Sequence, residues 1–162
     1  MKLLYPPLVS CLLSLVSSCG FAPMYSDNAA LQRELADIYI APIAGTNGID
    51  LRNRLILAWN TANEAPAKYH LSVRLNEPET IYKGLQITGD ATWEEVRIRA
   101  SWELKSGEET IAKSSEAASE SYTFVSDLVS ANASKTSAIG NAIQEIGNKI
   151  ELKVNAKLKR GS

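Results

Sequence analysis

The chain has 162 residues, which is an ordinary length for one domain. Its 17 Lys and Arg residues almost balance 18 Asp and Glu residues, and the formal net charge is −1. This balance gives no indication of nucleic-acid binding, and we expect no nucleic-acid partner. One His and two Cys residues leave little material for a metal centre or a nucleophile. We therefore expect a protein that is not an enzyme and that uses no metal or cofactor.

The first 18 residues have the features of an export signal. Residues 1–16 (MKLLYPPLVSCLLSLV) contain one positive charge, Lys2, and then a short apolar run. The run is shorter than the roughly 20 residues of a membrane-spanning helix. Pro6 and Pro7 disfavour a buried N-terminal helix. A charged start, a short apolar middle and a small-residue end are typical of a signal peptide, which we place at residues 1–18.

The end of this leader holds a candidate lipid-attachment site. Val16-Ser17-Ser18-Cys19 resembles the bacterial lipobox, an apolar residue and two small residues before Cys. The resemblance implies that Cys19 is acylated and becomes the mature N-terminus. Leu8-Val9-Ser10-Cys11 fits the same letters, but the apolar run before it is too short and a second run follows it. The alternative, a buried or disulfide-bonded Cys19, is weakened because removal of Cys11 leaves a single Cys.

A tether and the first elements of a domain follow. Residues 19–34 form the expected lipidated tether, with a short helix over 26–34. The brief alternation at 35–41, which ends before Pro42, predicts a strand. Turn residues at 45–48 precede an expected helix over 49–63. In that helix Leu51, Leu55 and Trp59 recur at helical spacing.

Alternating residues predict the strands that come next. Strict alternation at 69–75 predicts a second strand, and 81–88 resumes after Pro78 as an edge strand or an arm. Alternation at 96–105 predicts the next strand, with Trp102 on its apolar side. Ser106-Gly107 predicts a hairpin turn. The return strand at 110–123 has a weak apolar signal and is predicted from the hairpin.

The last segment, 126–159, is predicted to be a long amphipathic helix. Its apolar stripe has a period near 3.6 and consists of Ile139, Ile143, Ile146, Ile150 and Val154. Lys149, Lys153 and Lys157 recur on another face. The order β-α-β-β-β-α predicts an α+β fold. We expect a two-layer sandwich over residues 35–160, in which two helices cover one face of a four-stranded, mostly antiparallel sheet.

Several short motifs resemble one protein family. Cys19-Gly20-Phe21-Ala22-Pro23-Met24-Tyr25 is similar to the start of the mature LPS-assembly lipoproteins (LptE-like). These are the small lipidated subunits of the outer-membrane lipopolysaccharide translocon. Leu51-Arg52-Asn53-Arg54-Leu55 resembles the family's motif on its first helix. Tyr69-x-Leu71-x-Val73 resembles its second strand, and Ser121-Tyr122 before a long final helix also fits.

The resemblance implies a function and a location. It implies that the domain is a plug inside a large outer-membrane β-barrel, an LptD-like LPS-assembly protein. The barrel would need this plug both to assemble and to pass lipopolysaccharide outward. It also implies a lipid anchor in the outer membrane, on the periplasmic side, because Gly20 rather than Asp follows Cys19. The alternative is an auxiliary periplasmic lipoprotein of a lipid-transport ABC system. Such auxiliaries favour a doubled Tyr, which this chain lacks.

The candidate contact residues form a basic row on the predicted sheet. Arg74, Arg97 and Arg99 occupy outward positions of neighbouring strands, and Lys105 continues the row. Guanidinium groups match phosphate oxygens well, and lipopolysaccharide carries phosphates. We predict that this row contacts lipopolysaccharide or the barrel. The alternative is a solvated face on which these cations pair with nearby carboxylates, namely Glu95, Glu103 and Glu116.

Other titratable residues have simpler interpretations. His70 lies on the outward side of its strand, where we expect solvent around it. The pairs Glu94-Glu95 and Glu108-Glu109 are expected to be surface charge. Glu145 precedes Lys149 by four residues, which predicts an ion pair along the last helix.

Overall fold

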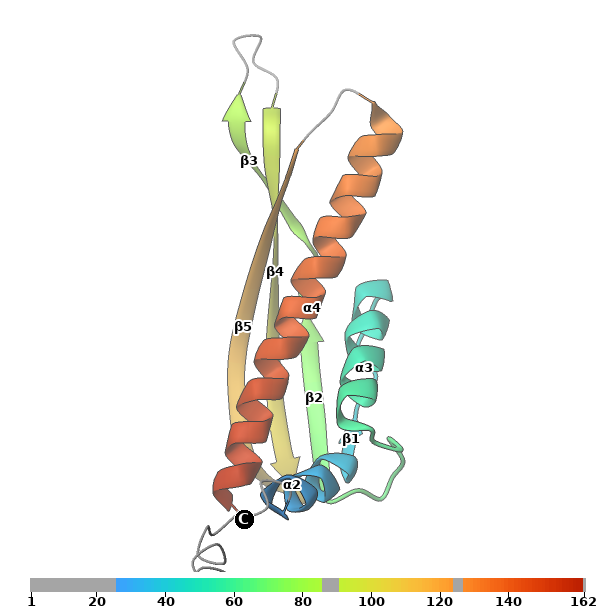
Figure 1. The fold of residues 1–162 in the computed structure, drawn as a ribbon, viewed down its shortest axis with the longest axis vertical. Coiled ribbons are helices and arrows are strands. Elements are labelled where there is room, and N and C mark those ends of the chain that lie inside the picture. The colour runs from blue at the N-terminus through green and yellow to red at the C-terminus, as the bar shows by residue number, and fades with distance from the viewer. Residues whose placement is uncertain (1–25, 86–90, 124–126, 162) are drawn as a thin grey trace, which may run out of the picture.

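The computed structural model describes residues 26–85, 91–123 and 127–161. Their helices and strands, in chain order, are α2 (Ser26–Ala36), β1 (Ile38–Ile40), α3 (Thr46–Trp59), β2 (Tyr69–Leu75), β3 (Glu79–Leu85), β4 (Ala91–Ser106), β5 (Glu109–Thr123) and α4 (Leu128–Gly161). Figure 1 shows an elongated arrangement in which α4 and α3 lie on one side of a single sheet. This confirms the predicted α+β class.

The sheet is built around β4. One edge of β4 pairs with β5 in an antiparallel hairpin, from Trp93 opposite Thr123 to Ser106 opposite Glu109. The hairpin turn contains Gly107, whose φ of 57° favours glycine. The other edge of β4 pairs first with β3 and then with β2, both antiparallel. β1 adds to β2 in parallel.

Side chains satisfy individual edge backbone groups of β1 and β5. At β1, Asn63 Oδ1 accepts a hydrogen bond from Ile40 N at 2.6 Å, and Arg52 Nε donates to Ile40 O at 3.0 Å. At β5, Lys149 Nζ from α4 donates to Ala117 O at 2.6 Å. Such contacts reduce unwanted strand pairing, because an open edge is a template for another chain.

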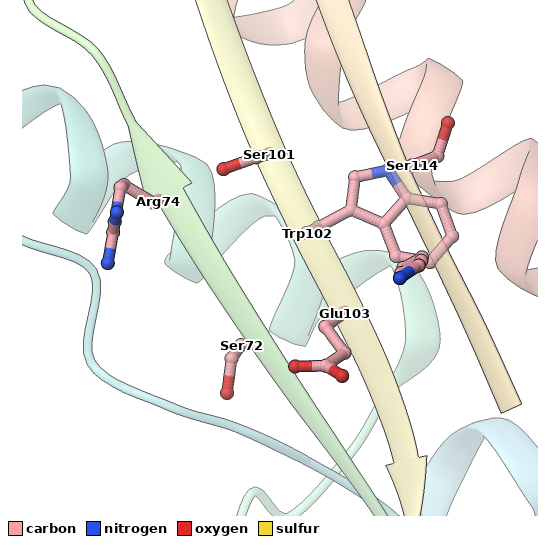
Figure 2. A pocket seen from close by; sticks show the side chains of 7 residues that line it. Ser72, Arg74, Ser101, Trp102, Glu103 and Ser114 are labelled. Carbon is pink, nitrogen blue, oxygen red and sulfur yellow. The ribbon is translucent and has the colours of Figure 1, made fainter. Parts of the chain in front are cut away.

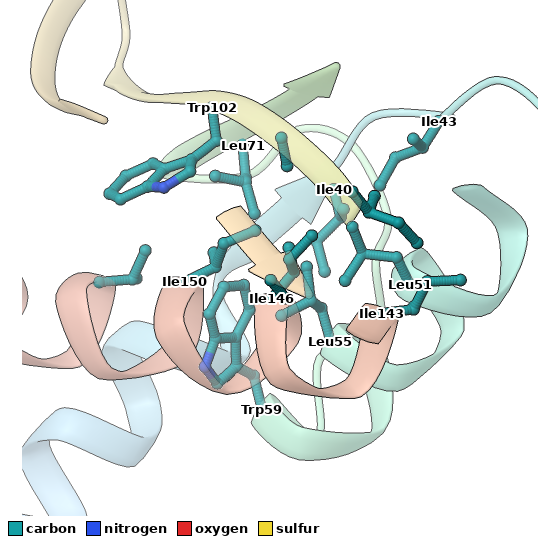
Figure 3. Packing of buried hydrophobic residues seen from close by; sticks show 14 of the residues in the cluster. Ile40, Ile43, Leu51, Leu55, Trp59, Leu71, Trp102, Ile143, Ile146 and Ile150 are labelled. Carbon is teal, nitrogen blue, oxygen red and sulfur yellow. The ribbon is translucent and has the colours of Figure 1, made fainter. Parts of the chain in front are cut away.

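The core lies between the sheet and the helices. Figure 3 shows Trp59 of α3 and Ile146 and Ile150 of α4 facing Leu71 and Trp102 of the sheet. All of these side chains are buried, including Trp59 at 1% exposure and Trp102 at 4%. The helical spacing in α3 and α4 and the alternation in β4 therefore predict the buried faces correctly.

The number of elements differs from the prediction. The described residues contain five strands and three helices, whereas the predicted sandwich has four strands and two helices; the third helix, α2, corresponds to the short helix expected over 26–34. The segment after Pro78 is a paired strand, β3, because it continues along the same edge of β4 that β2 leaves at Leu75. The first strand is shorter than 35–41, because Leu35 and Ala36 complete α2. α3 ends at Trp59 because Asn60 adopts the left-handed conformation, with a φ of 49°.

The described helices are not membrane-spanning segments by length and hydropathy. In the described part of the chain, no helix is long and apolar enough to cross a bilayer. The predicted signal peptide and Cys19 lie outside the described residues.

Candidate functional site

One face of the sheet is covered by none of the described helices and forms the candidate site. We call it the outer face; in β4 it consists of the residues that alternate with the buried Val96, Ile98 and Ala100. The strand register brings the predicted basic residues onto it. Arg97 lies opposite Glu79 and Ser119, Arg99 opposite Ala117, Arg74 opposite Ser101, and Lys105 opposite His70.

Three of the four predicted cations have carboxylate partners on the same face. Arg97 Nη2 lies 2.8 Å from Glu95 Oε1, and Lys83 Nζ lies 3.2 Å from Glu95 Oε2. Arg99 Nη1 lies 3.4 Å from Glu79 Oε2.

Burial alone would raise the pKa of Glu95, but hydrogen bonds from Lys83 and Arg97 outweigh it and lower that pKa. Lys105 Nζ lies 3.9 Å from Glu103 Oε2. Most of the row is therefore neutralised by its own neighbours.

Arg74 is different. No ion pair or hydrogen bond of its side chain is found among the described residues. It lines an open hollow of about 470 Å³ on the outer face, which we call the sheet trough. The other lining residues are Ser72, Ser101, Trp102, Glu103, Lys113 and Ser114. Figure 2 shows Arg74 and Ser72 on β2, with Ser101 and Glu103 on the neighbouring strand β4.

Lys113 supplies a second cation to the sheet trough. It lies opposite Glu103 in the β4–β5 register, yet no ion pair joins it to any described residue. Lys113 is not predictable from the sequence, because the small residues of β5 obscure the alternation that would place it on the outer face. Two unpaired cations beside Ser hydroxyls can bind a phosphate, whereas ion-paired arginines must first give up a partner.

On the opposite face of the sheet, β5 provides partners for two lysines of the α4 stripe, Lys149 and Lys153. Glu116 was expected among the outward carboxylates, but it lies opposite the buried Ala100 and faces α4. Its Oε1 accepts from Trp102 Nε1 at 3.0 Å and pairs with Lys153 Nζ at 2.7 Å. Burial would raise the pKa of Glu116, but hydrogen bonds from Lys153, Trp102 and Ser114 lower it overall. Lys149 and Lys153 therefore join α4 to the sheet.

The described residues do not contain a metal cluster. No group of three or more His, Cys, Asp and Glu side chains among them could hold a metal ion. His70 forms a ring contact with Tyr39 at 5.5 Å between centroids.

Comparison with solved structures identifies the fold. The chain is similar to a candidate lipoprotein of Caulobacter crescentus, with a TM-score of 0.67, 24% identity, and coverage of 82% of this chain and 98% of that one. It is also similar to the rare lipoprotein B of Shewanella oneidensis, with a TM-score of 0.59, 12% identity, and coverage of 74% and 93%. A minor lipoprotein of Acinetobacter baumannii gives a TM-score of 0.53 at 13% identity, with coverage of 75% and 92%.

These likenesses concern the fold alone. No protein-family model matches the chain, and no curated protein matches it in sequence. The described elements thus have the architecture that these three bacterial proteins share.

Proposed function

We propose that this protein is a lipid-anchored outer-membrane subunit that plugs and helps to assemble a β-barrel lipopolysaccharide translocon. In this proposal Cys19 carries the lipid, and the domain contributes to lipopolysaccharide transport to the cell surface. Two independent lines support it. The motif at residues 19–25 resembles the LPS-assembly lipoproteins, and the fold is similar to solved structures that are named as lipoproteins.

The open outer face is the observation that carries the proposal. Arg74 and Lys113 line the sheet trough without ion pairs to described residues, and Ser72 and Ser101 lie beside them on the outer face. Phosphates of lipopolysaccharide supply the matching charge, because Arg and Lys form short charge-assisted hydrogen bonds to phosphate oxygens. Arg97, Arg99 and Lys105 are proposed as weaker contacts, since each already has a carboxylate partner.

The outer face also suits a barrel interior. β4 has 16 residues, which corresponds to a length of roughly 50 Å at about 3.3 Å per residue. Along this length, basic, acidic and hydroxyl side chains alternate with buried ones. The interior of a large membrane barrel is polar, and such barrels are often filled by a plug. A long sheet face of mixed charge is therefore compatible with a position inside one.

Co-purification separates this function from the alternative. The full-length chain with a C-terminal tag is expressed in a Gram-negative host, extracted from the outer membrane in detergent, and isolated with its partners. We expect a large β-barrel protein in a fixed ratio to the chain. An ATP-driven transporter in its place would support the ABC-auxiliary function. If neither partner co-purifies, both functions are rejected.

A further inference from the structure

A second cavity lies at the end of the molecule where α2 packs. It has a volume of about 420 Å³, and we call it the end cavity. Residues of α2, of the start of β2, of the β4–β5 hairpin and of the last turns of α4 line it, including Glu34, Lys68, Glu109 and Lys157. Figure 1 shows α2, the start of β2 and the C-terminal end of α4 together at this end.

Two of its charged groups already satisfy each other. Glu34 accepts hydrogen bonds from Lys68 Nζ at 2.7 and 2.8 Å, and Tyr69 donates its hydroxyl to the same carboxylate at 2.5 Å. The hydrogen bond from Lys68 lowers the pKa of Glu34, and the return effect raises the pKa of Lys68. This pair forms a neutral wall of the end cavity.

The other two charged groups, Glu109 and Lys157, have opposite signs. No ion pair joins Glu109 to Lys157, or either of them to any other described residue. Both are exposed, yet both line the same cavity. Between them, the buried Leu158 and the half-buried Ile111 supply an apolar floor. A ligand that fits has a cationic group, an anionic group and methylene groups.

The position of the end cavity indicates where such a ligand comes from. Ser26, the first residue of α2, is only seven positions after Cys19. An extended chain spans at most about 3.5 Å per residue, so a lipid on Cys19 would hold α2 within roughly 25 Å of the membrane surface. This step depends on the proposed acylation of Cys19.

We propose that the end cavity binds the phosphoethanolamine headgroup of a membrane phospholipid. Glu109 accepts hydrogen bonds from the ammonium group, and Lys157 donates to the phosphate. The glycerol carbons pack against Ile111 and Leu158. A phosphatidylcholine headgroup fits less well, because its quaternary ammonium group has no N–H to donate to Glu109. An acidic phospholipid without an amine leaves Glu109 facing a negative surface.

Vesicle flotation tests this proposal without the lipid anchor and without lipopolysaccharide. The chain beginning at Gly20 is suitable, because the core side chains of the described part of the protein lie within residues 31–158. It is mixed with vesicles of phosphatidylcholine alone, or with an equal share of phosphatidylethanolamine or phosphatidylglycerol. We expect flotation with the phosphatidylethanolamine vesicles and little with the other two. Preference for phosphatidylglycerol, or no preference, overturns the proposal.

Matched variants locate the site. Glu109→Gln and Lys157→Ala are each expected to weaken binding by about tenfold, the effect of losing one charge-assisted contact. Glu108→Gln and Lys159→Ala are neighbours that do not line the end cavity, and they should bind as the parent does. Equal loss in the control variants, or no loss in the cavity variants, overturns the proposal. A negative result here leaves the barrel-plug function open, because co-purification and lipid analysis of Cys19 test that separately.

Discussion

The side chain of Arg54 on α3 lies directly across Gly147 on α4. A Cβ atom added to Gly147 would come within 2.5 Å of Arg54 Nε and 2.7 Å of Arg54 Cδ. Arg54 Nη2 also donates a hydrogen bond to Asn148 Oδ1. The absence of a side chain at Gly147 thus lets α3 and α4 approach and lets Arg54 reach the next residue of α4.

This contact predicts opposite effects for two glycines of one helix. Gly140→Ala should raise the free energy of unfolding by about 0.5–1 kcal/mol, because Ala favours a helix and nothing lies near the new methyl group. Gly147→Ala should lower the free energy of unfolding, because its methyl group displaces Arg54. Urea melts of both variants measure this difference. An equal gain in both would show that Arg54 moves away freely.

Glu116 predicts part of the acid sensitivity of the domain. Its folded-state pKa lies below the ordinary value of 4.5, so its contribution is complete above about pH 4.5 and is lost as the pH falls through the lower folded-state pKa. The free energy of unfolding of Glu116→Gln should therefore fall less than that of the parent between about pH 5 and about pH 3. Denaturant melts across this range provide the measurement, and parallel curves for the two proteins would contradict it.

The partner of Glu116 gives a related prediction. Lys153→Met should lower the free energy of unfolding by about 1–3 kcal/mol, because the buried carboxylate loses a charged donor. Lys149→Met is the matched control. It loses the pair with Glu145, which is 42% exposed and contributes at most about 1 kcal/mol, and the hydrogen bond to Ala117 O, but it leaves no buried carboxylate without a charged donor. A larger effect at Lys149 than at Lys153 would show that the Glu116 contact is not the stronger tie between α4 and the sheet.

Trp102 tests the register of the central strand. Trp102→Ala should cost about 3–5 kcal/mol, because the ring is buried. Trp93 is on the opposite face of the same strand and is 43% exposed, so Trp93→Ala should lower the free energy of unfolding far less. A one-residue slip would exchange the two faces. A cost below about 1 kcal/mol for Trp102→Ala would therefore indicate the wrong register.

These contacts also show how far the sequence alone can predict the structure. Period-two alternation identifies the buried side of β4, and period 3.6 identifies the buried side of α4, because both patterns report on burial. Alternation does not identify the neighbour of a strand. The pairing of β3 along the edge that β2 leaves, and hence the fifth strand, depends on the chain path after Leu75. Likewise, an outward Arg is predictable, whereas the carboxylate that neutralises Arg99 comes from Glu79 on another strand.

The lipid anchor is tested at Cys19. Mass spectrometry of the mature N-terminus should show a chain that begins at Cys19 and carries acyl groups. Two or more chains are needed for stable anchoring, because one chain holds a protein at a membrane only marginally. An unmodified Cys19, or a mature chain that starts elsewhere, would contradict the prediction.

Lipopolysaccharide binding by the outer face tests the central claim most directly. The chain beginning at Gly20 is compared with two double variants, Arg74→Ala with Lys113→Ala in the sheet trough, and Arg97→Ala with Arg99→Ala among the ion-paired residues. Each well-placed charged contact contributes about 1.5–3 kcal/mol, so the trough variant should bind lipopolysaccharide about 100-fold more weakly or worse. The second variant should lose less, because its arginines already have partners. Unchanged binding in the trough variant, with its fold intact by circular dichroism, would contradict the claim that the outer face binds lipopolysaccharide through Arg74 and Lys113.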